Sequence, residues 1–187
     1  MQDNQLLKKE GVNGRVVALW SLALALYLFY LLGHNPVSTF CYYLRDTYTE
    51  AVYRNAILGV GKILLGVYVL WLVWRLRLTA HKWLKISVWL LFAGVLTTYY
   101  NDMVKISIEY VHFMQYCGLT IVVAYALRGR SLLACALCLL AGFMDEVYQT
   151  LAPVSQLNWR DVGLNVTGCI WGWLLLWTLK TDVVSSR

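Results

Sequence analysis

Runs of about 20 apolar residues constrain the fold more than any other feature, because an α-helix of that length crosses the hydrocarbon core of a bilayer. Six such stretches occur, at residues 15–33, 56–74, 83–100, 106–127, 131–150 and 161–179. Of the 187 residues, 60% are hydrophobic, against roughly 45–50% in soluble domains. The sequence therefore predicts an all-α integral membrane protein, a six-transmembrane-helix bundle that forms a single membrane domain over residues 1–187.

Composition also excludes several other classes. The net charge of +6 comes from basic residues placed between apolar runs, so it indicates membrane topology rather than binding to nucleic acid. Four of the five cysteines lie inside apolar runs, so no disulfide framework is expected. The first apolar run resembles a signal peptide but ends in GHNP without a small-residue cleavage site, so we interpret it as an uncleaved first span.

Lys and Arg in the loops predict the orientation, because cytoplasmic loops carry the excess of both residues. With the N-terminus inside, the outer segments hold four basic residues, which are Arg45, Arg54, Lys105 and Arg160. The inner segments hold eleven, which are Lys8, Lys9, Arg15, Arg75, Arg77, Lys82, Lys85, Arg128, Arg130, Lys180 and Arg187. The sequence thus predicts that both termini are cytoplasmic in a multi-pass membrane protein.

The longest predicted outer segment, 34–55, is rich in aromatic residues. Phe40, Leu44, Tyr48 and Val52 recur at helical spacing, which is typical of a helix lying along the membrane interface. We therefore expect an interfacial outer loop or helix at 36–54. An interface anchor is the favoured role, and a lid over a site below it is the alternative.

Polar side chains fall at one predicted depth in four spans. At a rise of about 1.5 Å per residue, all of them lie within roughly 10 Å of the outer edge of the hydrocarbon. They are Lys62 in the second span, Glu109 and His112 in the fourth, Asp145, Glu146 and Gln149 in the fifth, and Asp161 and Asn165 in the sixth. Ionisable residues inside membrane spans usually mark a functional site, so we favour a functional role over structural hydrogen bonding.

Single residues in this set also have ordinary structural explanations. Gly168 and Gly172 form a GxxxG pattern, which close helix packing explains better than a ligand role. His112 could serve only as an interhelical hydrogen-bond partner, and Lys62 could extend toward the outer headgroups. His112 together with the acids would suit a divalent cation, but no HxxxH or paired CxxC spacing specifies one. No metal or cofactor is therefore predicted.

Three blocks of the sequence resemble the VanZ-like family of bacterial membrane proteins. They are HFMQYCGL at 112–119, DEVYQ at 145–149, and Pro153 followed by Asp161, Asn165, Gly168 and Gly172. The family pattern is KxxHFxxYxxL, then DExHQ, then PGR followed by DxxxNxxGxxxG. The match covers residues 105–175, so a VanZ-like core over residues 83–179 would follow the N-terminal spans 15–33 and 56–74, which the resemblance does not cover.

Three positions depart from the family pattern. Glu109 replaces a usual Lys, Tyr148 a usual His, and Ser155 the arginine of PGR. The site is therefore more acidic than the pattern implies, and Lys62, Lys105 or Arg160 would have to supply a cation for a phosphate. The resemblance implies a cell-envelope role associated with low-level resistance to teicoplanin-type glycopeptides, without an established biochemical activity.

Two functional hypotheses follow. In the first, an outer-leaflet pocket binds membrane lipids, a lipid-linked envelope precursor or an amphiphilic glycopeptide. Its binding residues would be Tyr116, Gln149, Asp161, Asn165, Lys62, Glu109 and Arg160. In the second, a membrane-embedded hydrolase or transferase acts on a lipid headgroup, with Asp145 or Glu146 orienting His112 as a general base. Transport is disfavoured, because the inner halves of the spans carry almost no polar residues.

Overall fold

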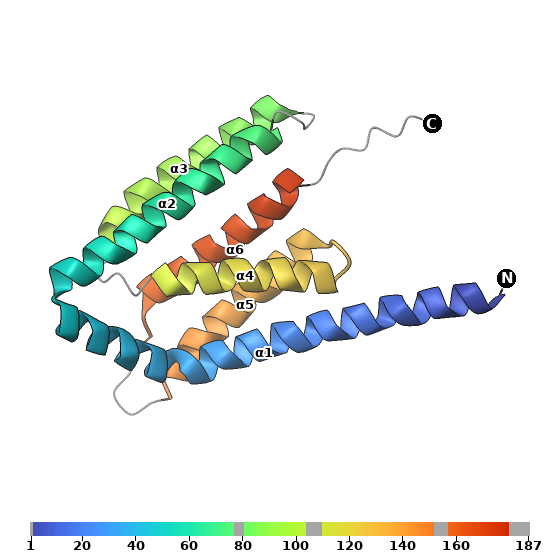
Figure 1. Ribbon diagram of the computed structural model, residues 1–187, viewed down its shortest axis with the longest axis horizontal. Coiled ribbons are helices and arrows are strands. Elements are labelled where there is room, and N and C mark those ends of the chain that lie inside the picture. Colours follow the sequence, from blue (N-terminus) through green and yellow to red (C-terminus); the bar gives the residue numbers. More distant parts are fainter. Residues whose placement is uncertain (1, 77–80, 104–109, 152–156, 180–187) are drawn as a thin grey trace. The chain divides into compact units, whose positions relative to one another are not determined.

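The computed structural model describes residues 2–76, 81–103, 110–151 and 157–179, which form helices and turns without a β-strand. The predicted all-helical fold is confirmed. In chain order the helices are α1 (Gln2–Tyr48), α2 (Glu50–Leu76), α3 (Lys82–Met103), α4 (Tyr110–Ala126), α5 (Ser131–Gln149) and α6 (Trp159–Leu179) (Figure 1). Each predicted apolar stretch falls on one helix, except that residues 106–109 lie outside the described part and residues 127 and 150 lie in turns just after α4 and α5.

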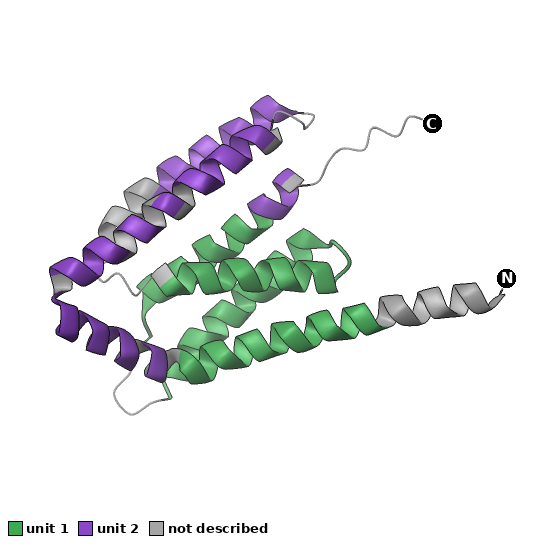
Figure 2. Cartoon of the chain, in the orientation of Figure 1, with its two compact units in different colours: residues 1–34, 111–173 green, residues 35–110, 174–187 purple. Residues whose placement is uncertain are grey.

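The chain divides into two compact units, each assembled from separate parts of the sequence. Unit 1 contains residues 1–34 and 111–173, and unit 2 contains residues 35–110 and 174–187 (Figure 2). Within α1, the boundary between the units falls next to Pro36, which lacks the N–H that a helical hydrogen bond requires. The expectation of a single membrane domain stays a prediction.

The segment predicted to lie along the interface is helical but is not a separate helix. Residues 36–48 continue α1 through Pro36, and α2 begins at Glu50. Thr49, between the two helices, has a φ of 65°, in the left-handed region that ends a helix. The first span and the interfacial segment were expected to be separate elements. Pro36 lies inside the helix.

A tight turn orders two helices of unit 1. Arg128 and Gly129 have φ values of 54° and 87°, and the Gly129 N–H donates a hydrogen bond of 2.8 Å to the Ala124 carbonyl. This bond closes the end of α4 in the manner of a glycine C-cap, and α5 begins two residues later at Ser131. The start of α4 and the end of α5 therefore lie at the same end of unit 1.

Two helices of the described part are long and apolar enough to cross a membrane. They are the Gly14–Gly33 portion of α1 and all of α5, whereas Val111–Ala126 in α4 is apolar but shorter. Large apolar side chains point outward from these helices, including Leu32, which is 67% exposed, and Leu132, which is 70% exposed. Such surfaces are rare on soluble proteins.

Unit 2 has an aromatic contact network of its own. The rings of Tyr68 on α2 and Trp89 on α3 lie 5.8 Å apart in an edge-to-face arrangement, a geometry that aromatic quadrupoles favour. The Trp89 indole N–H donates a 2.8 Å hydrogen bond to the Thr178 hydroxyl on the last turns of α6. This bond satisfies a buried donor that hydrocarbon surroundings could not satisfy.

Candidate functional site

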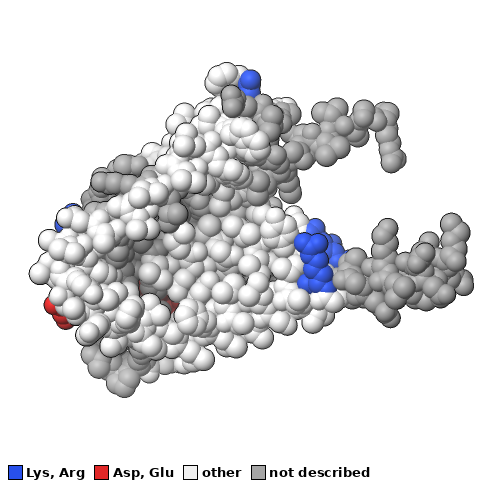
Figure 3. Space-filling model, viewed as in Figure 1, with Lys and Arg blue, Asp and Glu red and all other residues white. Residues whose placement is uncertain are grey.

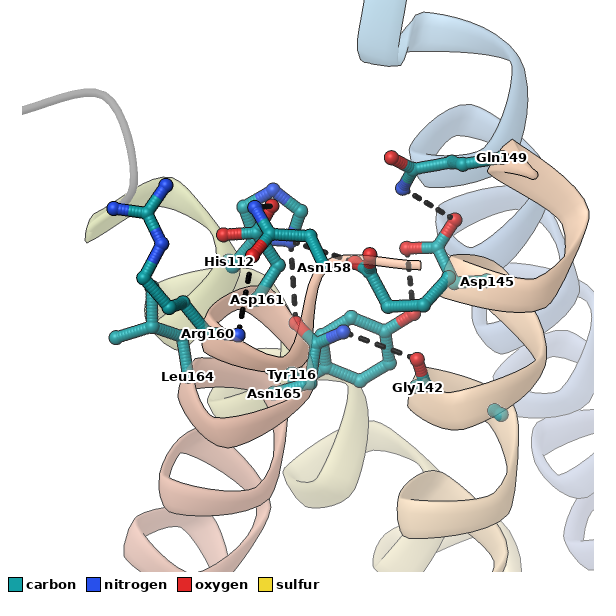
Figure 4. Close-up of polar contacts among 12 residues, drawn as sticks. His112, Tyr116, Gly142, Asp145, Gln149, Asn158, Arg160, Asp161, Leu164 and Asn165 are labelled. Atoms are coloured by element: carbon teal, nitrogen blue, oxygen red, sulfur yellow. Dashed lines mark hydrogen bonds and ion pairs between the residues drawn. The ribbon is translucent and has the colours of Figure 1, made fainter. Parts of the chain in front are cut away.

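Three helices of unit 1 bring together most of the polar residues singled out in the sequence. Figure 4 shows side chains from the start of α4, the end of α5 and the start of α6 directed toward one another. We call this group the polar cluster, and its members are His112, Tyr116, Asp145, Glu146, Gln149, Asp161 and Asn165. All of these except Gln149 are buried, so the cluster is an internal site rather than a solvated surface.

Glycines allow the three helices to approach closely at this level. A Cβ on Gly168 would lie 2.4 Å from the Phe113 carbonyl oxygen, and one on Gly172 would lie 2.7 Å from the Cys117 carbonyl oxygen. The backbones of α4 and α6 are therefore in direct contact, as expected for a GxxxG pattern. The packing role inferred for Gly168 and Gly172 agrees with this contact.

Gly142 on α5 has a comparable role that the sequence did not reveal. A Cβ there would lie 2.9 Å from the Asn165 Cβ and 3.1 Å from the Tyr116 ring. The missing side chain at this position is what lets Tyr116 and Asn165 pack against α5. An isolated glycine in an apolar helix gives no sequence signal for such a contact.

Asp145 is held by two neutral donors. The Tyr116 hydroxyl donates a 2.9 Å hydrogen bond to its Oδ2, and the Gln149 amide donates one of 3.4 Å to its Oδ1. Asp145 is 2% exposed and Tyr116 is fully buried. Hydrogen bonds to a buried carboxylate contribute more than neutral ones, so these donors fix the carboxylate in one orientation.

Asn165 links α6 to both other helices. Its Nδ2 donates a 3.1 Å hydrogen bond to the Gly142 carbonyl on α5, and its Oδ1 lies 3.2 Å from His112 Nδ1 on α4. Because the carbonyl can only accept, the amide nitrogen must face α5 and the amide oxygen must face the imidazole. In this arrangement His112 carries a hydrogen on Nδ1, and Asn165 helps to orient the ring.

Glu146 is a member of the polar cluster with an unsatisfied oxygen. It is 1% exposed, and its Oε1 is a buried oxygen without a hydrogen-bond partner. The distance from this oxygen to His112 Nδ1 is 3.9 Å, which is too long for a hydrogen bond. A buried oxygen without a partner is costly, and in a native site it calls for a ligand or ion as its explanation.

Asp161 has one satisfied and one unsatisfied oxygen. The Asn158 amide, just before α6, donates a 2.7 Å hydrogen bond to Oδ2, while Oδ1 is buried without a hydrogen-bond partner. Glu146 lies within electrostatic range of both Asp161 and Asp145. Three buried carboxylates thus share one region, where their mutual repulsion favours the uptake of positive charge.

Two tyrosines of α1 also reach this level, and they were not among the predicted site residues. The Tyr27 hydroxyl donates a 3.2 Å hydrogen bond to the Ala141 carbonyl on α5, and the Tyr30 ring lies 6.0 Å from the Tyr116 ring. Their spacing of three residues puts both on one helix face. That spacing is the only signal in the sequence that could have indicated a shared role.

The remaining predicted site residues are Arg160, Lys62 and several residues outside the described part. Arg160 donates its backbone N–H to the Asn158 side chain, and Figure 4 shows its guanidinium extending away from Asp145. Lys62 belongs to α2 in unit 2, and its side chain lies outside the described part. Glu109, Lys105, Pro153 and Ser155 lie outside the described residues.

Comparison with known proteins identifies no relative. The chain matches no family model, no curated protein and no solved structure.

Proposed function

We propose that this chain is a VanZ-like multi-pass protein of the bacterial plasma membrane whose polar cluster binds a lipid-linked component of the cell envelope. Binding there gives low-level tolerance to teicoplanin-type glycopeptides. The observation that carries the proposal is the meeting of His112, Asp145 and Glu146, all buried, at one end of three apolar helices. Buried ionisable groups in a membrane segment are costly, and function is the usual reason for retaining them.

The proposed location in a membrane is supported by the surface of the helices. Leucines such as Leu70 on α2, 74% exposed, and Leu91 on α3, 71% exposed, face outward. Neither α2 nor α3 is one of the two helices of the described part that are long and apolar enough to cross a membrane. Lipid tails would cover these side chains without cost. In this proposal all six helices cross the bilayer, and residues 36–48 of α1 lie along its outer interface.

The proposed topology is supported by the charges at the two ends of unit 1. Arg15, Arg128 and Arg130 are exposed, and Figure 3 shows basic atoms gathered where α1 enters the described surface of this unit. His112 precedes Arg128 by 16 residues, so the polar cluster lies about 20 Å from the basic end along the helices. The basic end then faces the cytoplasm, both termini are inside, and the cluster lies in the outer leaflet.

The family assignment is supported by which residues touch. In the three resembling blocks, the shared positions His112, Tyr116, Asp145 and Asn165 are those joined by hydrogen bonds, directly or through Gly142. The shared Gly168 supplies the close contact with α4. These bonds form two neighbouring groups, His112 with Asn165 and Tyr116 with Asp145, and bonds between such polar positions favour a binding site over separate packing contacts.

The proposed ligand has apolar tails and a polar head. Tails could pass between helices from the lipid while the headgroup meets the amide and carboxylate groups of the polar cluster. A lipid-linked envelope precursor has this chemistry, and an amphiphilic glycopeptide would compete for the same site. Such a site needs no aqueous path across the membrane.

Replacing the three acids tests the proposal. We expect Asp145→Asn, Glu146→Gln and Asp161→Asn together to abolish glycopeptide tolerance in a susceptible bacterial host that expresses the chain, because they remove the charge of the polar cluster while keeping its shape. The measurement is the minimal inhibitory concentration of teicoplanin. Membrane fractions probed for the protein establish that the variant is inserted.

A matched control is Asp46→Asn. Its side chain is 67% exposed and pairs with the neighbouring Arg45, so this variant should keep full tolerance. A correctly inserted triple variant that still confers full tolerance would contradict the assignment of the site.

A second function, hydrolysis or transfer at a lipid headgroup, is favoured by the orientation of one imidazole. Because the hydrogen on His112 Nδ1 faces Asn165, Nε2 is the nitrogen of the neutral ring that would accept a proton as a general base. In hydrolysis by this route, a water that gives its proton to the imidazole would be the attacking group.

Turnover separates the two functions. Purified protein is incubated with envelope lipids, and the lipids are then analysed by mass spectrometry. We expect intact lipid that co-purifies with the protein, as binding requires. A modified product that forms with the wild type and is lost in His112→Gln would instead establish the enzyme.

A further inference from the structure

One region of the polar cluster has the geometry of a cation site. His112, Asp145 and Glu146 each offer a ligand atom, and these atoms all lie within 4.8 Å of one another. The three residues are 8%, 2% and 1% exposed. One imidazole and two carboxylates from two helices therefore face a common point that solvent does not reach.

The unsatisfied oxygen of Glu146 is the independent sign of a missing partner. Its Oε1 is buried without a hydrogen bond and stands 3.9 Å from His112 Nδ1. Two ligands of one ion, each about 2.0–2.2 Å from the metal, are at most about 4.4 Å apart. The distance is too long for a direct bond and short enough for an ion between the two atoms.

Asn165 extends the same set of ligands. Its Oδ1 lies 3.2 Å from His112 Nδ1, a spacing that suits neighbouring ligands on one ion. The bond from its Nδ2 to the Gly142 carbonyl keeps this oxygen directed at the site. An amide oxygen is an ordinary ligand for a divalent cation, and the cation would replace the hydrogen on Nδ1 that otherwise joins the two side chains.

We propose that His112, Asp145, Glu146 and Asn165 bind one divalent cation. A set of one nitrogen and three oxygens is typical of Zn²⁺ or Mn²⁺ rather than of Mg²⁺ or Ca²⁺, which take oxygen ligands. The cation satisfies Glu146 Oε1 and balances the charge of two buried carboxylates. The ligand atoms of His112, Asp145 and Glu146 lie within 4.8 Å of one another, and small rotations of the side chains bring them within the ~4.4 Å that two ligands of one ion can span.

The cation also resolves a conflict in charge, a point that rests on the proposed function. An anionic headgroup would be repelled by Asp145, Glu146 and Asp161, and the family's usual Lys and Arg are replaced here by Glu109 and Ser155. A bound divalent cation with an open coordination position attracts phosphate oxygens. It would supply the positive charge that these two replacements remove.

Metal binding is measured directly on the full chain. Protein purified in detergent, freed of any affinity tag and treated with chelator is titrated with ZnCl₂ and, separately, with MnCl₂ by isothermal titration calorimetry. We expect saturation at one cation per chain for at least one of the two. Glu146→Gln should weaken binding at least ~10-fold, because changes around a metal site typically cost 10–100-fold in affinity.

Asp46→Asn, an exposed acid, is the matched control and should bind as the wild type does. Wild-type protein that takes up neither ion overturns the proposal, as does a folded Glu146→Gln variant with unchanged affinity. If that variant does not fold, the test is a titration of the wild-type protein with Co²⁺, followed by visible absorption. New absorption bands that disappear when Zn²⁺ is added support the site. A spectrum identical to that of free aqueous Co²⁺ overturns the proposal.

These outcomes are separate from the test of the proposed function. A chain that binds the cation but no envelope lipid keeps this inference and contradicts the lipid-binding role. A chain that binds envelope lipid but no cation contradicts this inference and keeps the lipid-binding role.

Discussion

Gly168→Ala is expected to lower the free energy of unfolding by about 1–3 kcal/mol, although it adds only one methyl group. The new Cβ would lie 2.4 Å from the Phe113 carbonyl oxygen, and neither backbone can turn away as a side chain would. The helices α4 and α6 must separate. That movement also stretches the 3.2 Å contact between His112 and Asn165. Thermal unfolding in detergent measures the stability change.

Gly118→Ala makes the same chemical change on α4 at a position with open space. A Cβ there meets no atom within 4 Å, so this control should be neutral or gain up to about 1 kcal/mol from higher helix propensity. The difference between the two variants isolates the helix contact from propensity. Equal unfolding temperatures for both variants would show that α4 and α6 do not touch at Gly168.

Tyr116→Ala is expected to cost about 3–5 kcal/mol, the usual loss when a large buried aromatic residue is removed. The side chain is fully buried and packs against Gly142 and the Tyr30 ring. Tyr116→Phe keeps this packing but removes the hydroxyl that donates to Asp145. It should therefore cost less, about 1–3 kcal/mol. Denaturation followed by circular dichroism gives both values.

Tyr125 on the same helix is the control for this pair. It is 51% exposed, so Tyr125→Phe should change stability by no more than about 0.5 kcal/mol. If Tyr116→Phe is as stable as the wild type, the hydroxyl does not contribute to holding Asp145. If it is as damaging as Tyr116→Ala, hydrogen bonding rather than packing is the main role of this residue.

Depth along the helices was the most informative property of the sequence. Counting residues from the ends of the apolar runs placed His112, Asp145 and Asp161 at one level, because the rise per residue of an α-helix is constant. The structure brings His112 and Asp145 together and sets Asp161 within electrostatic range of Glu146. Depth therefore pointed to these residues without any knowledge of packing, whereas the side chain of Lys62 and the whole of Glu109, counted at the same level, lie outside the described part.

Pairing within the polar cluster was not predictable in the same way. Asp145 or Glu146 was expected to orient His112, but Asn165 lies within hydrogen-bond distance of the ring and Glu146 Oε1 lies 3.9 Å away. Rotation of each helix about its axis decides which atoms meet. That rotation depends on contacts such as the one at Gly142, which a pattern of residue types does not record.

The sequence by itself determined that the chain is helical, where its apolar runs begin and end, and which polar residues share a level, because these follow from hydrophobicity and from the fixed rise of a helix. Only the tertiary structure decided that Asn165 joins His112 to α5, that Glu146 keeps a buried oxygen unsatisfied, and that tyrosines of α1 reach the same site. The physical reason is that such contacts depend on interhelical distances of a few ångströms, which close packing at a few glycines sets.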